Sequence, residues 1–207
     1  MLEIFSFLGV GLILGLANGM TPGPLMTMIF SETLHHGQKA GIKVAVAPLF
    51  TDIPVVFSIL FIVSRFSKVD SIIGAISIIG ALVLGYYSYE NIFAKAKVQI
   101  KKTEPKSFRK GILTNFFNPH LYINSFAVHT PIMLRALRIN ILAMIIYFAG
   151  FVLALVSSKI ILAILIGKSK KFFESKYYIY AIKALGFILL LFAVVFLTDG
   201  LKYFKII

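Results

Sequence analysis

Apolar residues gather in six long stretches that hold almost no Asp, Glu, Lys or Arg. The stretches cover residues 4–31, 44–64, 71–89, 111–134, 139–167 and 177–198. Their apolar positions run on continuously instead of alternating, which favours helices over the strands of a lipid-facing barrel. Each stretch has roughly the 20 residues that a helix needs to cross a bilayer core about 30 Å thick. The pattern therefore predicts an all-α polytopic membrane protein with six transmembrane helices.

Composition supports this prediction and excludes a soluble fold. Of the 207 residues, 59% are hydrophobic and 14% are charged, and the mean hydropathy is +0.93. Soluble domains carry about 25% charged residues. Six apolar helices in so short a chain would have nothing to bury them in water, so we expect the lipid bilayer to cover them.

The charges predict how the chain is oriented in the membrane. Lys and Arg number 21 against 8 Asp and Glu, a net charge of +13, which on a soluble protein would suggest nucleic acid. Here thirteen of the basic residues fall in alternate loops, and six fall on the other side. The positive-inside rule assigns the thirteen to the cytoplasm. We therefore expect a protein of the cytoplasmic (inner) membrane with both termini outside and no nucleic-acid partner.

The most basic loop, residues 95–110, divides a single membrane domain, residues 1–207, into two groups of three helices. Repeat one covers about residues 1–94 and repeat two about residues 111–207. Because three spans is an odd number, a second copy would enter the membrane from the opposite side, as in inverted-repeat transporters. We interpret the loop as a cytoplasmic orientation signal that lies against anionic lipid.

Two of the predicted helices contain matching breaks. In the first helix, Asn18-Gly19-Met20-Thr21-Pro22-Gly23-Pro24 is a poor helix interior, because its prolines remove backbone donors. In the fourth, Asn115-Phe116-Phe117-Asn118-Pro119-His120 repeats the spacing Asn-x-x-x-Pro. Freed backbone groups are tolerated in lipid only where protein or a water-filled cavity receives them, so matched breaks favour a transport site. Pro and Gly are also common in membrane helices, and a chance match is the alternative.

The same runs resemble a known family. The segments from Asn18 to Pro24, from Gly37 to Gly41 ahead of Asp52, from Gly80 to Tyr86 and from Lys110 to Pro119 are similar to the lysine exporter (LysE/RhtB) family of amino-acid efflux transporters. The resemblance covers nearly the whole chain and implies a six-helix inner-membrane exporter of amino acids that uses the proton or ion gradient. His120 stands where members often have Lys, and the sixth span carries Lys183 and Asp199. These departures leave the identity of the substrate open.

Asp52 and Lys159 are charged residues well inside predicted spans. At 1.5 Å per residue, each lies about 12 Å from the cytoplasmic end, so the two could meet. An ionised group at that depth costs several kcal/mol unless it is paired, hydrated or neutralised. We interpret Asp52 as a proton-coupling group or as the partner of a substrate ammonium. Lys159 could pair with Asp52 or could snorkel to the cytoplasmic headgroups.

The helix ends at the two breaks supply the remaining candidates, because their amides suit a carboxylate and their bare carbonyls suit an ammonium or ion. The candidates for substrate or ion binding are Asn18, Thr21, Pro22, Gly23, Pro24, Asp52, Asn115, Asn118, Pro119, His120 and Lys159. The Asn and Thr side chains could instead only cap broken backbone, and His120 could titrate near neutral pH or only pack. His129 lies nine residues after His120, on the opposite face of a regular helix, which argues against one metal site containing both.

These features predict a secondary transporter that exports an amino acid or a related small zwitterionic or cationic metabolite. The alternative is an exporter of divalent metal or another cation on a related scaffold. An enzyme is not expected, because the chain has no Cys, no His-Glu-x-x-His motif and no nucleophile beside a base. No cofactor and no bound metal are expected. Gly74, Gly80 and Gly85 would allow close packing in a homodimer or within the chain.

Overall fold

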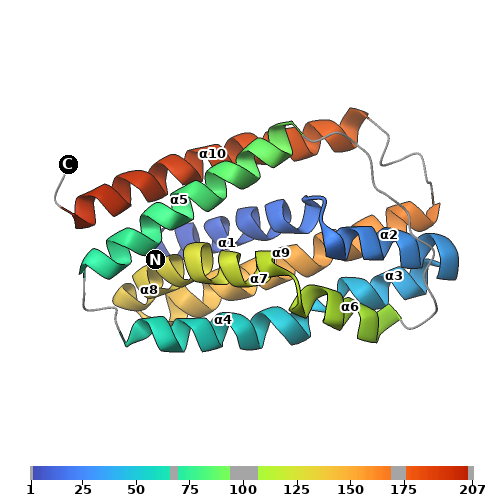
Figure 1. Cartoon of the computed structure of the whole chain (residues 1–207), viewed down its shortest axis with the longest axis horizontal. Helices are drawn as coiled ribbons and strands as arrows, with labels where there is room; N and C mark the ends of the chain where they lie inside the picture. Colours follow the sequence, from blue (N-terminus) through green and yellow to red (C-terminus); the bar gives the residue numbers. More distant parts are fainter. Residues whose placement is uncertain (1, 66–69, 94–106, 169–175, 205–207) are drawn as a thin grey trace.

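The computed structural model describes residues 2–65, 70–93, 107–168 and 176–204. Every regular element within these residues is a helix, which confirms the all-α class. The elements are α1 (Leu2–Met20), α2 (Pro24–His36), α3 (Gln38–Ala45), α4 (Pro48–Ser64), α5 (Asp70–Ile92), α6 (Ser107–Phe116), α7 (Pro119–Asn124), the π-helical turn η1 (Ser125–His129), α8 (Thr130–Ile139), α9 (Ile141–Lys168) and α10 (Lys176–Tyr203). The long helices run roughly along one axis of the molecule (Figure 1). Most of the predicted basic loop, residues 95–106, lies outside the described residues.

The number of membrane-crossing helices depends on how the breaks are counted. By length and apolarity four segments of the described chain can cross a bilayer: Gln38–Ser64, Ile73–Ile92, Ile141–Lys168 and Ile179–Tyr203. A fifth forms if α1 and α2, bent by 59° at their junction, count as one broken span. The predicted fourth span, residues 111–134, is divided among α6, α7, η1 and α8 and does not pass as one helix. The polytopic class is confirmed, and six spans stay a prediction.

Small residues let α1 and α9 pack closely. Gly11, Gly15 and Gly19 recur every fourth residue, so they lie on one face of α1. A Cβ atom at Gly11 or Gly15 would collide with a backbone oxygen of α9, and one at Gly19 would collide with the Ser158 side chain. Their partners on α9 advance in the same direction along the chain, so the two helices are parallel. Such small-residue faces are a usual means of helix association in membranes.

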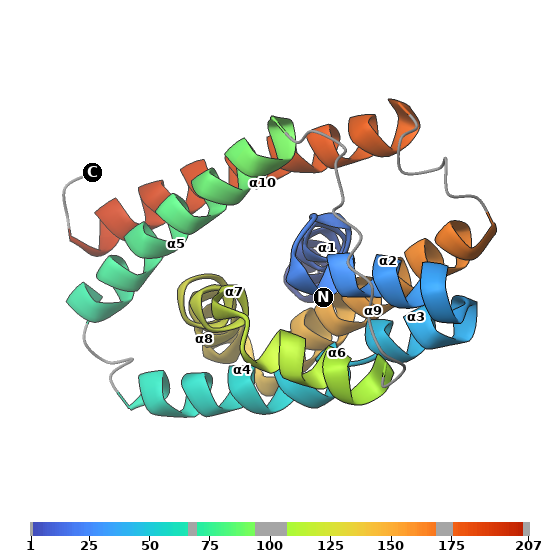
Figure 2. The same cartoon turned by 45° about the vertical axis from the view of Figure 1, so that its right-hand side comes forward.

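The second close pair is α5 and α10, which run antiparallel. Gly74 faces Tyr203 and Phe204 at one end of the pair, and Gly80 faces Phe196. Two of the three glycines considered for a homodimer, Gly74 and Gly80, thus make close contacts within the chain, whereas Gly85 faces open space. Homodimerisation stays a prediction. Figure 2 shows this pair along one side of the molecule, with α1 and α7 facing it.

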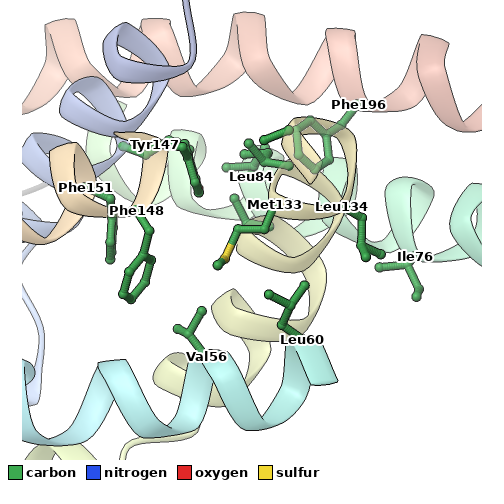
Figure 3. Close-up of a cluster of buried hydrophobic side chains, with 14 of the residues drawn as sticks. Val56, Leu60, Ile76, Leu84, Met133, Leu134, Tyr147, Phe148, Phe151 and Phe196 are labelled. Atoms are coloured by element: carbon green, nitrogen blue, oxygen red, sulfur yellow. The ribbon is translucent and has the colours of Figure 1, made fainter. Parts of the chain in front are cut away.

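The main core lies where α4, α5, α8, α9 and α10 meet. Figure 3 shows its members: Val56 and Leu60 from α4, Leu84 from α5, Met133 and Leu134 from α8, Tyr147, Phe148 and Phe151 from α9, and Phe196 from α10. Large apolar side chains also point outward, such as Leu82, Leu153 and Leu191, each at least 66% exposed. In water such a surface would be a liability, and in a bilayer it is the surface that contacts lipid.

Candidate functional site

The first break separates α1 from α2. α1 ends at Met20 and α2 begins at Pro24, whose missing N–H costs nothing at a first helical position. Gly23 before it is extended, with φ −165° and ψ −176°, and gives α2 no side-chain cap. The last carbonyls of α1 and the first amides of α2 therefore have no partners within their own helices.

The second break separates α6 from α7. α6 ends at Phe116 and α7 begins at Pro119, and the Asn118 Oδ1 accepts a hydrogen bond from the His120 amide at 3.1 Å. Both breaks that the sequence predicts are confirmed. They differ in that the second helix start is capped by its own Asn, whereas the first is not capped by a side chain.

A cavity of about 620 Å³, here called the central cavity, lies between the two breaks. Its wall is built by α1, α2, α4, α5, α6, α7, η1 and α9. All eleven candidates line it: Asn18, Thr21, Pro22, Gly23, Pro24, Asp52, Asn115, Asn118, Pro119, His120 and Lys159. The structure thus brings together residues that are up to 141 positions apart in the chain.

Asp52 is buried on α4 and is fixed by two side-chain donors. Its Oδ1 accepts from the Thr51 hydroxyl at 2.9 Å and from the Asn115 Nδ2 at 2.6 Å. Asn115 Nδ2 also lies 2.5 Å from the Thr51 hydroxyl oxygen. Because Asn115 comes from α6, this cluster joins α4 to the helix that precedes the second break. Hydrogen bonds to a charged group are the stronger kind, so the carboxylate is held in place.

Lys159 is buried on α9 and reaches the first break. Its Nζ donates to the carbonyl oxygens of Gly19 at 3.3 Å and Asn18 at 3.5 Å. These carbonyls end α1, where the helix dipole places partial negative charge. The side chain does not snorkel, and Lys159 and Asp52 form no ion pair in the structure. The Lys159 ammonium and the Asp52 carboxylate therefore both face the central cavity, each held by uncharged groups.

α5 supplies a wall of the cavity that the sequence did not predict. Thr21 Oγ1 lies 3.2 Å from Asn91 Oδ1, and the His120 ring stacks on Tyr87 with centroids 4.2 Å apart. Glu90 also lines the cavity and accepts a hydrogen bond from the Tyr86 hydroxyl at 2.8 Å. Glu90 is the charge that ends the third apolar stretch, so a search for acids at span ends would have found it.

His129 also lines the central cavity and was not among the predicted candidates. The α-helical count placed His129 opposite His120, yet both line the central cavity. The π-helical turn Ser125–His129 accounts for this, because i to i+5 bonding adds a residue to the turn and changes the face on which the later residues lie. The His129 Nδ1 lies 2.7 Å from the Tyr147 hydroxyl, and its Nε2 lies 3.4 Å from the Asn124 Nδ2.

A separate polar contact lies away from the central cavity. The Arg135 guanidinium of α8 forms an ion pair with Asp199 of α10, and its Nη2 donates to the Ser77 hydroxyl of α5 at 3.4 Å. Lys183 of α10 is half-buried and does not line the cavity. No three His, Cys, Asp or Glu side chains of the described ranges are grouped to hold a metal ion.

Comparison with known proteins gave one match. The family model described as LysE type translocator matches residues 16–200. No curated protein and no solved structure matches the chain.

Proposed function

The chain belongs to the LysE type translocator family, and on that premise we propose that it exports amino acids, or closely related small zwitterions or cations, across the cytoplasmic membrane. Membership and the apolar helices make it a multi-pass membrane transporter and point away from an enzyme. We further propose that a proton or ion gradient drives this export.

The observation that carries the proposal is the pair of opposite charges on the cavity wall. Asp52 and Lys159 face one cavity, are both more than 90% buried and do not pair with each other. Charges kept apart in a low-dielectric interior are costly, and an amino acid brings the two complementary charges on one small molecule. In the proposal Asp52 binds the substrate ammonium and Lys159 binds its carboxylate.

The first break adds to the carboxylate site. Lys159 rests on the end of α1, and Pro24 at the start of α2 lines the same cavity. The free amides at a helix start are ready donors to an anion. Gly23 leaves room for close approach, since a Cβ there would meet no atom within 4 Å. Lys159 and this helix start thus favour the same end of a zwitterion.

The pairing of helices supports an inverted repeat. α1 packs on α9, α4 packs on the α6 to α8 segment, and α5 packs on α10. A two-fold axis in the membrane plane exchanges the two halves of the chain. This exchange turns the contact between α1 and α9 into the contact between the α6 to α8 segment and α4, and it leaves the contact between α5 and α10 unchanged. With an inverted repeat, both termini lie on one side, and the excess of basic residues in alternate loops favours the outside.

The test is counterflow of labelled amino acids into proteoliposomes that hold the purified full chain. We expect wild-type protein to accumulate label, and Asp52→Asn to insert but lose both counterflow and gradient-driven efflux. Lys159→Gln should raise KM for an amino acid by about tenfold to a hundredfold, the worth of a hydrogen-bonded charge, and should change KM for the decarboxylated amine much less. Lys183→Gln, a lysine outside the cavity, is the matched control and should behave as wild type.

Three results would contradict the proposal. Normal efflux by Asp52→Asn would remove the assigned ammonium site. Equal effects of Lys159→Gln on the amino acid and on its decarboxylated amine would remove the carboxylate site. Accumulation of a divalent cation, with no amino acid carried, would favour the cation exporter instead.

A further inference from the structure

We propose that His129, which lies in the π-helical turn and is hydrogen-bonded to Tyr147 of α9, is the site at which this exporter binds its coupling proton. The inference rests on the proposed function and assigns the driving ion to a residue distinct from the two that bind the substrate. It concerns the part of the central cavity wall where His129 of η1 contacts Tyr147 and Phe151 of α9.

The position of the His129 ring supports this role. His129 is 2% exposed, yet it is one of the residues that line the cavity, so it is enclosed by protein and still borders the cavity. The Phe151 ring packs against it with centroids 4.1 Å apart. A buried ionisable side chain in a membrane protein is expensive and marks an ion path more often than it marks packing. π-Helical turns are also frequent at functional sites.

The hydrogen-bond partners of His129 can serve two protonation states. A neutral imidazole has one donor and one acceptor nitrogen, and an imidazolium has two donors. Tyr147 carries a hydroxyl that can accept or donate, and Asn124 carries an amide with both a donor and an acceptor end. Rotation of the hydroxyl and of the amide therefore satisfies His129 with or without its proton. A histidine that only joined η1 to α9 would not need two adaptable partners.

A proton on His129 would also be coupled electrostatically to the substrate site. The titratable and charged groups that line the cavity with His129 or touch it from the packed elements are Asp52 on α4, Tyr86, Tyr87 and Glu90 on α5, His120 on α7, and Tyr147 and Lys159 on α9. Protonation places a second positive charge on a wall that already holds Lys159. Through like-charge repulsion it also opposes the entry of a substrate ammonium into the same cavity. Mutual exclusion of a proton and a substrate from one cavity is what exchange of the two across a membrane requires.

The experiment compares gradient-driven accumulation with counterflow in the same proteoliposomes. Gln keeps an uncharged hydrogen-bonding group at the position but does not bind a proton in this range. We expect His129→Gln to lower accumulation driven by an imposed pH gradient about tenfold more than it lowers counterflow. Its counterflow rate should also lose the wild-type dependence on pH between about pH 5 and 8. The exposed His35, outside the cavity, provides the control His35→Gln, which should keep both properties.

Tyr147→Phe is the second variant, because it removes the hydroxyl and leaves the imidazole. Tyr147 acts as a positioning residue, so this change should shift the midpoint of the pH profile and preserve gradient-driven transport. If His129→Gln fails to fold, the Tyr147→Phe profile decides: a shifted midpoint supports the proposal and an unchanged one overturns it.

Other outcomes overturn the proposal. Equal losses of counterflow and of gradient-driven accumulation in His129→Gln would mean a structural or substrate-binding role, and a wild-type pH response would mean no role in coupling. If wild-type protein performs amino-acid counterflow but does not respond to a pH gradient, the coupling inference fails and the proposed substrate stands. If wild-type protein performs no amino-acid counterflow, the proposed function itself fails.

Discussion

At the scale of single residues, the two buried charges of the central cavity are held by different kinds of neighbour. Asp52 is fixed by the side chains of Thr51 and Asn115, whereas Lys159 is fixed by the backbone carbonyls of Asn18 and Gly19. The Lys159 site therefore depends on the shape of the main chain at the first break, and the Asp52 site depends on side chains. If a substrate displaced the Lys159 ammonium from the end of α1, the carbonyl oxygens of Asn18 and Gly19 would be able to accept hydrogen bonds from another donor.

Single glycines of α1 give a stability prediction with an internal control. A Cβ at Gly15 would collide with the backbone of Phe151 and come within 2.8 Å of the Ala154 Cβ, so α1 and α9 would have to move apart. At Gly9, on the same helix, a Cβ would meet no atom within 4 Å. We expect Gly15→Ala to lower the free energy of unfolding by about 1 to 3 kcal/mol. Gly9→Ala should leave stability unchanged or raise it by up to about 1 kcal/mol, because Ala favours a helix.

Thermal unfolding of the purified variants in detergent, followed by circular dichroism, measures the difference. Equal midpoints for Gly15→Ala and Gly9→Ala would show that α1 and α9 are not in close contact.

At the scale of helices, the two breaks bring the ends of α1 and α6 and the starts of α2 and α7 to the central cavity. Replacing Pro22 and Pro24 together by Ala restores two backbone donors and favours a continuous helix across the first break. The carbonyls that bind Lys159 would then return to bonding within the helix. We expect expression and monodispersity to be kept while transport falls at least about tenfold, because the carboxylate end of the site is lost. The measurement is amino-acid counterflow per inserted protein.

Pro54 provides the matched control for this pair of substitutions. It also lies inside a membrane helix, α4, but it is exposed and does not line the central cavity. Pro54→Ala should therefore leave counterflow near the wild-type value. Normal counterflow in the double variant would show that the first break does not form the substrate site.

The helices also show which features a sequence can predict here. Pro22, Pro24 and Pro119 cannot continue a preceding helix, because proline lacks the backbone N–H, so both breaks and the candidates beside them could be predicted. Which face of α5 meets the cavity depends on how α5 packs on α10. The part of the cavity wall that α5 forms could therefore not be predicted from the sequence. His129 was missed for a different reason, because a π-helical turn shifts the periodicity on which the count from His120 relied. The fourth span was predicted as one apolar stretch, but the break before Pro119 and the π-helical turn Ser125–His129 divide it.

At the scale of the whole molecule, two polar contacts join the pair of α5 and α10 to other helices near the two ends of α5. Ser77 contacts Arg135 near the start of α5, and Asn91 contacts Thr21 near its end. About fourteen residues of helix separate these points, roughly 21 Å. The second contact lies beside the central cavity, because Glu90, the neighbour of Asn91, lines it.

The orientation of the molecule gives the last prediction, and the absence of natural cysteine makes it direct to test. His36 is the exposed last residue of α2, next to the turn that leads to α3, and Asn140 lies in the exposed turn between α8 and α9. With both termini outside, Asn140 faces the outside and His36 faces the cytoplasm. In intact cells we expect a membrane-impermeant maleimide to label Asn140→Cys, and to label His36→Cys only after the membrane is permeabilised.

The labelling pattern separates the orientation from the repeat itself. Asn140 caps α9 by accepting from the Ala143 amide at 2.7 Å, so its replacement costs about 1 kcal/mol, which a folding check on the purified variant would detect. Labelling of His36→Cys but not Asn140→Cys in intact cells would place the thirteen basic residues outside and refute the orientation. Labelling of both variants in intact cells would mean that the two turns lie on the same side, which an inverted repeat of three spans forbids.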